Sequence, residues 1–255
     1  MDDATQELRD VKLEIEGQGD LTDYLGINFT YHKDGFIIMS QQQLIDQIIK
    51  DVKLMANSHL SSTPAAASKL LQRDQKDKLF NGRFHCRSLI GRLSYLDKGT
   101  RPDITYATHQ CARFCEAPKE VHEKAVEYIV EYLKKTRNKV IILKLDKSKS
   151  LEVYADADFS GNWNKETSEF DASTAKSRTG FLILYAGCPI VWQSKLQTQC
   201  SLSTTEAEYI ALSQALREVI PIINLLEELT FNNIDTVSST PIVFCKAFED
   251  NLGAL

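Results

Sequence analysis

The chain has 255 residues, of which 43% are hydrophobic and 25% are charged, and its formal net charge is −5. This balance is typical of an ordinary globular protein with one large domain or two modest ones. No apolar run approaches the roughly 20 residues of a bilayer-spanning helix, and the acidic start MDDATQELRD is unlike a signal peptide, so we expect no membrane partner.

The charge is distributed unevenly along the chain. Residues 151–255 carry 6 basic and 14 acidic side chains, whereas residues 1–150 carry 24 basic and 21 acidic side chains. Seven basic residues fall in KKTRNKVIILKLDKSK, residues 134–149, against a single acid, Asp146. Such a run is either a solvated helix end and loop or a surface that faces phosphates. The asymmetry favours two functional units.

The six cysteines are scattered along the chain. Cys111 and Cys115 are four residues apart on a predicted helix, but no second pair completes a zinc site. We therefore expect buried thiols and an intracellular, reducing location.

The first half begins with a polar lead of helical character at residues 1–14. LTDYLGINFTYHKDGFIIMSQ, residues 21–41, alternates apolar and polar residues around Asp34 and Gly35, which predicts a β-hairpin. QQQLIDQIIKDVKL, residues 41–54, has helical spacing, and a connection rich in Ser, Pro and Ala follows it.

Residues 80–136 read as a small helical unit. Three helices are predicted, in residues 85–99, 104–116 and 118–136, and Pro118 begins the third. Basic residues stand in the last turn of that helix, where the helix dipole favours them. Arg101 and Asp103, in the connection TRPD, are expected to pair or to cap a helix.

The pattern changes to strands from about residue 139. KVIILKL and LEVYADADF are short strand-like runs, and GFLILYAGCPIVWQSK is two such runs joined by AGCP. A helix from residue 204 to about 229 follows, with Thr204 or Thr205 as its cap, and TPIVFCKAFED is a last strand. Residues 151–255 therefore predict the order β, β, β, α, β.

Three acids stand where these elements can bring them together. Asp156 follows the strand LEVYA, Glu208 lies in the first turn of the helix, and Asp250 follows the last strand. Clustered carboxylates repel one another unless a divalent cation neutralises them, and Mg²⁺ prefers such oxygen ligands. Acids in these positions are also common as helix caps and dipole partners, so spacing alone leaves both interpretations open.

Several segments of the sequence resemble, in the same order, segments of the ribonuclease H domain of copia-type retrotransposon Pol polyproteins. They are YADADFSGNW, KSRTGFLILYAGCPIVWQSKLQTQCSLSTTEAEYIAL and EDNLGAL. Upstream, DLTDYLGINF, FIIMSQQQLIDQII, STP, RSLIGRLSYL, TRPDITYA and APKEVHEKAVEYIVEYLKKT resemble the segment that joins the reverse transcriptase of these polyproteins to that ribonuclease. The resemblance runs from about residue 10 to the end.

The resemblance implies a fold of the α/β (α+β) class, a ribonuclease H-like mixed sheet with helices. It implies a reverse-transcriptase segment at 1–138, made of a β-hairpin and thumb- or connection-like helices, and a ribonuclease H-like domain at 139–255. The rest of a reverse transcriptase polyprotein would be its partner, in the cytoplasm within a virus-like particle or in the nucleus.

The resemblance also implies site residues. Asp156 in YADAD, Glu208 in TEAEY and Asp250 in EDN match the first three metal ligands of the family, for Mg²⁺ with Mn²⁺ as the alternative. Glu206 and Asp158 are expected to be neighbours of the site and not catalysts. The side chains expected to touch an RNA–DNA hybrid, or another nucleic acid, are Lys134, Lys135, Arg137, Lys139, Arg178, Ser203 and Thr204.

Two features of the family are absent from this sequence. No Tyr-x-Asp-Asp word of the polymerase site occurs, so DNA polymerisation by this chain is not expected. The family's ribonuclease continues beyond EDNLGAL with a helix, a His-containing loop and a fourth acidic ligand, so we expect a domain truncated at its C-terminus. The predicted function is metal-dependent hydrolysis of the RNA strand of RNA–DNA hybrids. The alternative is an inactive remnant, or a nucleic-acid-binding or accessory module of a larger reverse transcriptase.

Overall fold

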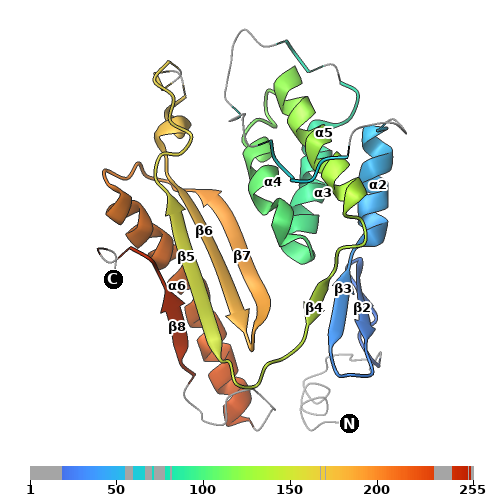
Figure 1. The fold of residues 1–255 in the computed structure, drawn as a ribbon, viewed down its shortest axis with the longest axis vertical. Helices are drawn as coiled ribbons and strands as arrows, with labels where there is room; N and C mark the ends of the chain where they lie inside the picture. The colour runs from blue at the N-terminus through green and yellow to red at the C-terminus, as the bar shows by residue number, and fades with distance from the viewer. Residues whose placement is uncertain are drawn as a thin grey trace, which may run out of the picture.

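The computed structural model describes residues 19–54, 60–66, 71, 78–80, 82–166, 168–169, 171–232, 243–251 and 253. Within these residues it is a mixed α/β structure with five α-helices and two four-stranded sheets (Figure 1). The polar lead expected at residues 1–14 lies outside the described residues. Helices gather beside the first sheet, and the second sheet has a long helix along one face.

The first sheet has the strand order β1-β2-β3-β4 and is antiparallel throughout. The predicted hairpin is confirmed: β2 (Ile27–Tyr31) pairs with β3 (Ile37–Ser40), and Gly35 in the turn has a φ of +79°, which glycine adopts without strain. The short β1 (Asp23–Tyr24) lies on the outer side of β2. Helix α2 (Gln42–Val52) follows directly and buries one apolar face.

The helical unit is formed by α2 and three further helices. These are α3 (Cys86–Gly99), α4 (Thr105–Ala112), which a 3₁₀ turn (Pro102–Ile104) precedes, and α5 (Glu120–Lys135). Pro118 precedes the start of α5 by two residues, and Lys119 is the N-cap. Leu93, Leu96 and Leu133 are fully buried where these helices meet. The apolar stripes that predicted the helices therefore form one core.

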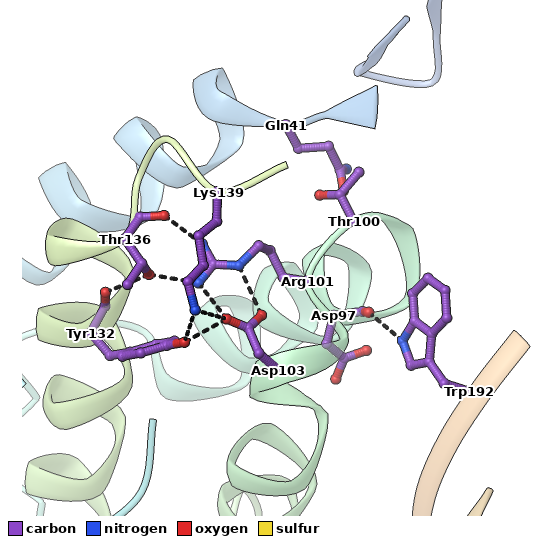
Figure 2. A network of polar contacts seen from close by, with 9 residues as sticks. All are labelled: Gln41, Asp97, Thr100, Arg101, Asp103, Tyr132, Thr136, Lys139 and Trp192. Carbon is purple, nitrogen blue, oxygen red and sulfur yellow. Dashed lines mark hydrogen bonds and ion pairs between the residues drawn. The ribbon is translucent and has the colours of Figure 1, made fainter. Parts of the chain in front are cut away.

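A buried arginine ties the α3–α4 connection to the end of α5 (Figure 2). Arg101 is 1% exposed and donates two hydrogen bonds of 2.9 Å to the carboxylate of Asp103, as the sequence led us to expect. It also donates to Oγ1 and to the carbonyl of Thr136. The Tyr132 hydroxyl donates to Asp103 and accepts from Lys139. Because every partner is charged or hydrogen-bonded, the ion pair can be buried without an orphan charge.

The second sheet has the strand order β7-β6-β5-β8. Strands β5 (Leu151–Asp158), β6 (Arg178–Tyr185) and β7 (Cys188–Leu196) form an antiparallel meander, and a second 3₁₀ turn (Ala172–Ala175) lies between β5 and β6. Helix α6 (Thr204–Phe231) crosses over to β8 (Cys245–Phe248), which pairs with β5 in parallel. The predicted order β, β, β, α, β is confirmed.

Small side chains bring α6 close to the sheet. Ala207, Ala211 and Ala215 recur every four residues, lie on one face of the helix and are fully buried. Val153 of β5 and Ile183 of β6 are buried beneath this face. By length and composition α6 is long and apolar enough to cross a membrane, with 28% of its apolar window buried in this structure; a core helix can pass the same test.

The helical unit contacts the second sheet through polar groups. The indole N–H of Trp192 on β7 donates to the carbonyl of Asp97 on α3 at 2.8 Å (Figure 2). Farther along, Arg113 donates to Ser173 at 2.6 Å. Gln110 on α4 donates to Asn162 at 3.3 Å. This seam is hydrogen-bonded, whereas each unit has its own apolar core.

One strand joins a different sheet from the one expected. Residues 139–145 were assigned to the second domain, and β4 (Ile141–Leu143) does form there. It pairs antiparallel with β3, however, so that Ile38 lies opposite Ile142. The local alternation of side chains predicts a strand but does not indicate which edge it will join.

We expect Ala211→Leu to destabilise the protein, because no space is left between α6 and the sheet for three more carbon atoms. The expected loss in the free energy of unfolding is about 1–3 kcal/mol, measured by urea denaturation. Arg217→Leu places the same side chain on the exposed face of α6 and should change stability by less than about 0.5 kcal/mol. Equal losses in the two variants would contradict the close packing.

The buried carboxyl of Asp97 should make stability depend on pH. Its Oδ1 has no hydrogen-bond partner among the described residues, and burial raises its pKa from 3.8 to about 7. Since the folded state favours the protonated acid, the contribution of Asp97 to stability is greatest below pH 4 and is lost as the pH rises from about 4 to 7. Asp97→Asn should therefore raise the melting temperature at pH 8 by about 2–4 °C for each kcal/mol recovered.

The gain from Asp97→Asn should shrink as the pH is lowered to 5, which thermal denaturation at the two pH values would measure. Glu218→Gln, on the exposed face of α6, is the control and should show no such difference. A gain that is independent of pH would exclude the buried charge as its cause.

Candidate metal centre

The strand β5 carries the first of the three predicted ligands. Its side chains alternate between a buried face toward α6, which includes Val153 and Ala155, and an exposed face, which includes Tyr154 and Asp156. Asp156 lies opposite Gly180 of β6, where the partner strand has no side chain. The carboxylate of Asp156 therefore stands on the open face near the end of the strand.

The start of α6 supplies the second ligand. The helix is capped by Ser203, whose hydroxyl accepts from the N–H of Glu206 at 3.1 Å, and the Glu206 carboxylate accepts from the N–H of Leu202 at 2.7 Å. The prediction that Thr204 or Thr205 caps the helix was wrong. The N-cap is Ser203, which with Glu206 caps the start of the helix. Glu206 is thus a capping residue, and Glu208 lies on the buried face of the helix, next to Ala207.

The parallel strand β8 brings in the third ligand. Its register with β5 sets Phe248 beside Tyr154, and their rings stack at 4.5 Å, so Asp250 follows at the level of Asp156. One carboxylate oxygen from each of Asp156, Glu208 and Asp250 lies within 4.8 Å of the others. The three predicted ligands, which are 52 and 42 residues apart in the sequence, are therefore brought together by the fold.

Glu208 is the least solvated member of this carboxylate cluster. Its side chain is 5% exposed, and its Oε2 has no hydrogen-bond partner among the described residues, although its carboxylate accepts from the N–H of Ala157. Burial, together with the negative charges of Glu249 and Asp156, raises the pKa of Glu208 to about 7. A buried carboxylate with an orphan oxygen, beside other carboxylates, lacks a positive partner.

A fourth carboxyl group at this place was missed by the sequence analysis. Glu249 precedes Asp250, its Oε2 is also buried without a partner among the described residues, and burial raises its pKa. Alternation along β8 could have indicated it, since the register puts Cys245 on the α6 side of the sheet and Glu249 is four residues farther on.

The donor set fits a hard divalent cation. It consists of carboxylate oxygens alone, two members are exposed to solvent, and one is buried with a free oxygen. Mg²⁺ and Mn²⁺ are bound by a few carboxylates together with waters and phosphate oxygens. Asp156, Glu208 and Asp250 can therefore hold such an ion and leave positions open for water or substrate.

Arg178, predicted to touch nucleic acid, lies on β6 at the seam with α4 and is 5% exposed. Its guanidinium stands over the ring of Tyr106 at 5.0 Å and lies 3.3 Å from His109 Nδ1 and from Ser194 Oγ. Burial lowers its pKa to about 10. In this position it connects the helical unit to the second sheet.

The other predicted nucleic-acid residues lie in two places. Arg137 forms a two-point ion pair with Asp46, at 2.5 Å for both contacts, and Lys139 belongs to the Arg101 network. Lys134 and Lys135 stand in the last turn of α5. All four belong to the helical unit and its connection to β4. The N-cap Ser203 and the exposed Thr204 lie at the start of α6, a few residues before Glu208 of the cluster.

Removing a charge from the cluster should stabilise the chain without metal and abolish its response to metal. Glu208→Gln relieves the buried repulsion, so its melting temperature in EDTA at pH 8 should exceed that of the wild type by several degrees. Added Mn²⁺ should raise the melting temperature of the wild type but not that of the variant. Differential scanning fluorimetry measures both effects.

Glu152→Gln is the matched control for this experiment. Glu152 lies on the same strand and the same face as Asp156, outside the carboxylate cluster. The control should keep the wild-type response to Mn²⁺. An equal response in the Glu208→Gln variant would show that the ion binds elsewhere.

Comparison with known proteins found several distant relatives, among them retrovirus-related Pol polyproteins of transposons. The chain is 34% identical over 196 residues to the retrovirus-related Pol polyprotein from transposon TNT 1-94 of Nicotiana tabacum. The matched region covers 75% of this chain and 14% of the polyprotein. Over 243 residues the chain is 30% identical to the Pol polyprotein from transposon RE1 of Arabidopsis thaliana, which is 95% of this chain and 15% of the polyprotein. A putative transposon Ty5-1 protein of Saccharomyces cerevisiae is 28% identical over 202 residues, 79% of this chain and 62% of that protein.

No family model and no solved structure matches the chain. The matches to the two plant polyproteins extend over most of this chain, although it spans only 14–15% of their length. The chain is therefore a distant homologue, at about 30% identity, of copia-type retrotransposon Pol polyproteins.

Proposed function

We propose that the second sheet and α6 form a ribonuclease H-like domain that hydrolyses the RNA strand of RNA–DNA hybrids with Mg²⁺ or Mn²⁺. The observation that carries the proposal is the carboxylate cluster of Asp156, Glu208 and Asp250, whose oxygens lie within 4.8 Å of one another. The homology to retrotransposon Pol polyproteins supports a role in reverse transcription.

The strand order supports this fold. An antiparallel meander of β5, β6 and β7, a helix on one face, and a parallel strand beside β5 agree with the mixed sheet that the resemblance implies. The cluster forms because β5 and β8 are parallel neighbours, so that their C-terminal ends lie at one edge of the sheet. Sites at that edge are common in sheets covered by helices.

The exposed and the buried carboxylates have different roles in the proposed reaction. Asp156 and Asp250 are exposed and face the substrate side, whereas Glu208 anchors the cluster from the buried side through its bond to the N–H of Ala157. A divalent ion held by these groups would supply positive charge for the scissile phosphate and make an attacking water more acidic. The buried position of Glu208 fixes the geometry of the site, because its side chain is held by packing and by the backbone.

Substrate would approach along the open side of the cluster. The N-terminus of α6 offers backbone N–H groups and the exposed hydroxyl of Thr204 for phosphate or sugar contacts. A hybrid would be recognised by its shape and its 2′-hydroxyl groups more than by its sequence.

A second candidate function rests on the homology alone. Similarity to retrovirus-related Pol polyproteins also agrees with a module that binds nucleic acid or supports a larger reverse transcriptase without cleaving on its own. Binding without cleavage would separate this function from the first.

The direct test uses the purified full chain, made in cells that lack their own ribonuclease H, with an RNA–DNA hybrid labelled on the RNA strand. We expect cleavage of the RNA in Mg²⁺ or Mn²⁺ and none in EDTA. Asp156→Asn should reduce the rate at least about 100-fold, because a missing ligand leaves the charge of the transition state uncompensated. Binding of the hybrid, measured by fluorescence anisotropy, should remain.

Glu152→Gln is the control and should cleave at the wild-type rate. Cleavage that survives in the Asp156→Asn variant would exclude the carboxylate cluster as the site. A folded wild-type chain that binds the hybrid but leaves the RNA intact with either ion would favour the accessory module.

A further inference from the structure

Two thiols meet at the surface of the helical unit, in a place that the proposed function does not use. Cys86 is the first residue of α3, and Cys115 follows α4 after one turn. Both thiols line the same open hollow, and each is the largest influence on the pKa of the other. Cys115 Sγ also lies 3.9 Å from the carbonyl of Cys111. All six cysteines of the chain are free in the structure, and these two are paired by the fold.

The thiol pair is accessible from solvent. Cys86 and Cys115 both line an open hollow of about 650 Å³, together with Phe84, Arg87 and Glu116. Cys86 is buried, whereas Cys115 is partly exposed. A small oxidant can therefore reach Cys115 first, with Cys86 immediately behind it.

The surroundings make the two thiols unequal. The hydrogen bond from Cys86 and the charge of Arg87 lower the pKa of Cys115 to about 7. The same hydrogen bond, together with burial, raises the pKa of Cys86. The neighbouring Cys111 is fully buried, and burial raises its pKa to about 12. Thiolates are the reactive form of cysteine, so Cys115 is the nucleophile of this group and Cys111 is inert.

We propose that Cys115 and Cys86 form a redox site that peroxides convert reversibly into a disulfide. The Cys115 thiolate attacks one peroxide oxygen, the O–O bond breaks, and a sulfenic acid forms while the second oxygen leaves as water after protonation. The Cys86 sulfur then attacks the sulfenic sulfur, the S–O bond breaks, and a second water leaves. Two thiols lose two electrons and two protons in total, hydrogen peroxide is reduced to two waters, and a thiol reductant reverses the change.

The disulfide would close a loop that contains all of α3 and α4. Helix α4 and the turn after it carry Gln110 and Arg113, which contact the second sheet. The oxidised state would therefore lock the part of the helical unit that lies against that sheet. The pair shares no residue with the carboxylate cluster, so the site can be tested separately from any nuclease activity.

The test treats the full chain with hydrogen peroxide at pH 7, blocks the remaining thiols with an alkylating reagent, and maps the unreduced digest by mass spectrometry. We expect a cross-linked peptide pair joining Cys86 to Cys115, lighter by two hydrogens than the reduced pair and restored by dithiothreitol. The exposed Cys200 provides the matched control, since Cys200→Ser should leave this cross-link unchanged.

Two single variants separate the steps. In Cys86→Ser the sulfenic acid has no partner, so Cys115 should be trapped by dimedone or proceed to the sulfinic acid. In Cys115→Ser the cross-link should disappear and Cys86 should stay reduced, with circular dichroism checking that the fold is kept. A folded wild-type chain whose Cys86 and Cys115 remain unlinked after oxidation, or link to other cysteines instead, would overturn the proposal.

Discussion

The close packing of α6 on β5 and β6 fixes the position of everything at the carboxylate cluster. Ala207, Ala211 and Ala215 let the helix axis approach the sheet, and Glu208 occupies the same buried face one residue after the first alanine. A larger side chain in this row would lift the helix and carry Glu208 away from Asp156. Three alanines with no chemistry of their own thus determine whether three carboxylates can meet.

The same packing buries the carboxylate of Glu208 at a cost in stability. Burying Glu208 beside Asp156 and Glu249 raises its pKa to about 7, which means that the folded chain disfavours the charged form on which metal binding depends. Nothing in the apolar core requires an acid at this position. A buried acid with an orphan oxygen, close to two other carboxylates, fits the proposed cation, because a cation would convert the repulsion into attraction.

Local patterns in the sequence predicted the elements well and their long-range pairing poorly. The hairpin, the helices and the order β, β, β, α, β were predicted from periodicity. The three carboxylates Asp156, Glu208 and Asp250 were predicted from motifs that resemble those of a known family. The sheet that β4 joins could not be read from residues 139–145, because any free strand edge satisfies the same alternation. Ser203 as the cap was missed because local patterns fix the first residue of a helix only to within one or two residues. Glu249 was missed because its place at the cluster follows from the register of β8 with β5.

The distribution of charge differs between the two halves of the chain and bears on how nucleic acid would bind. The run 134–149 has seven basic residues in the sequence, but Arg137 is paired with Asp46 and Lys139 lies beside Asp103, so part of its charge is already neutralised within the chain. The second half, with 14 acids against 6 basic residues, repels phosphates. In the proposed function a divalent cation therefore offsets the negative charge of the cluster where the phosphate must approach, and replacing one carboxylate by an amide also lowers that charge.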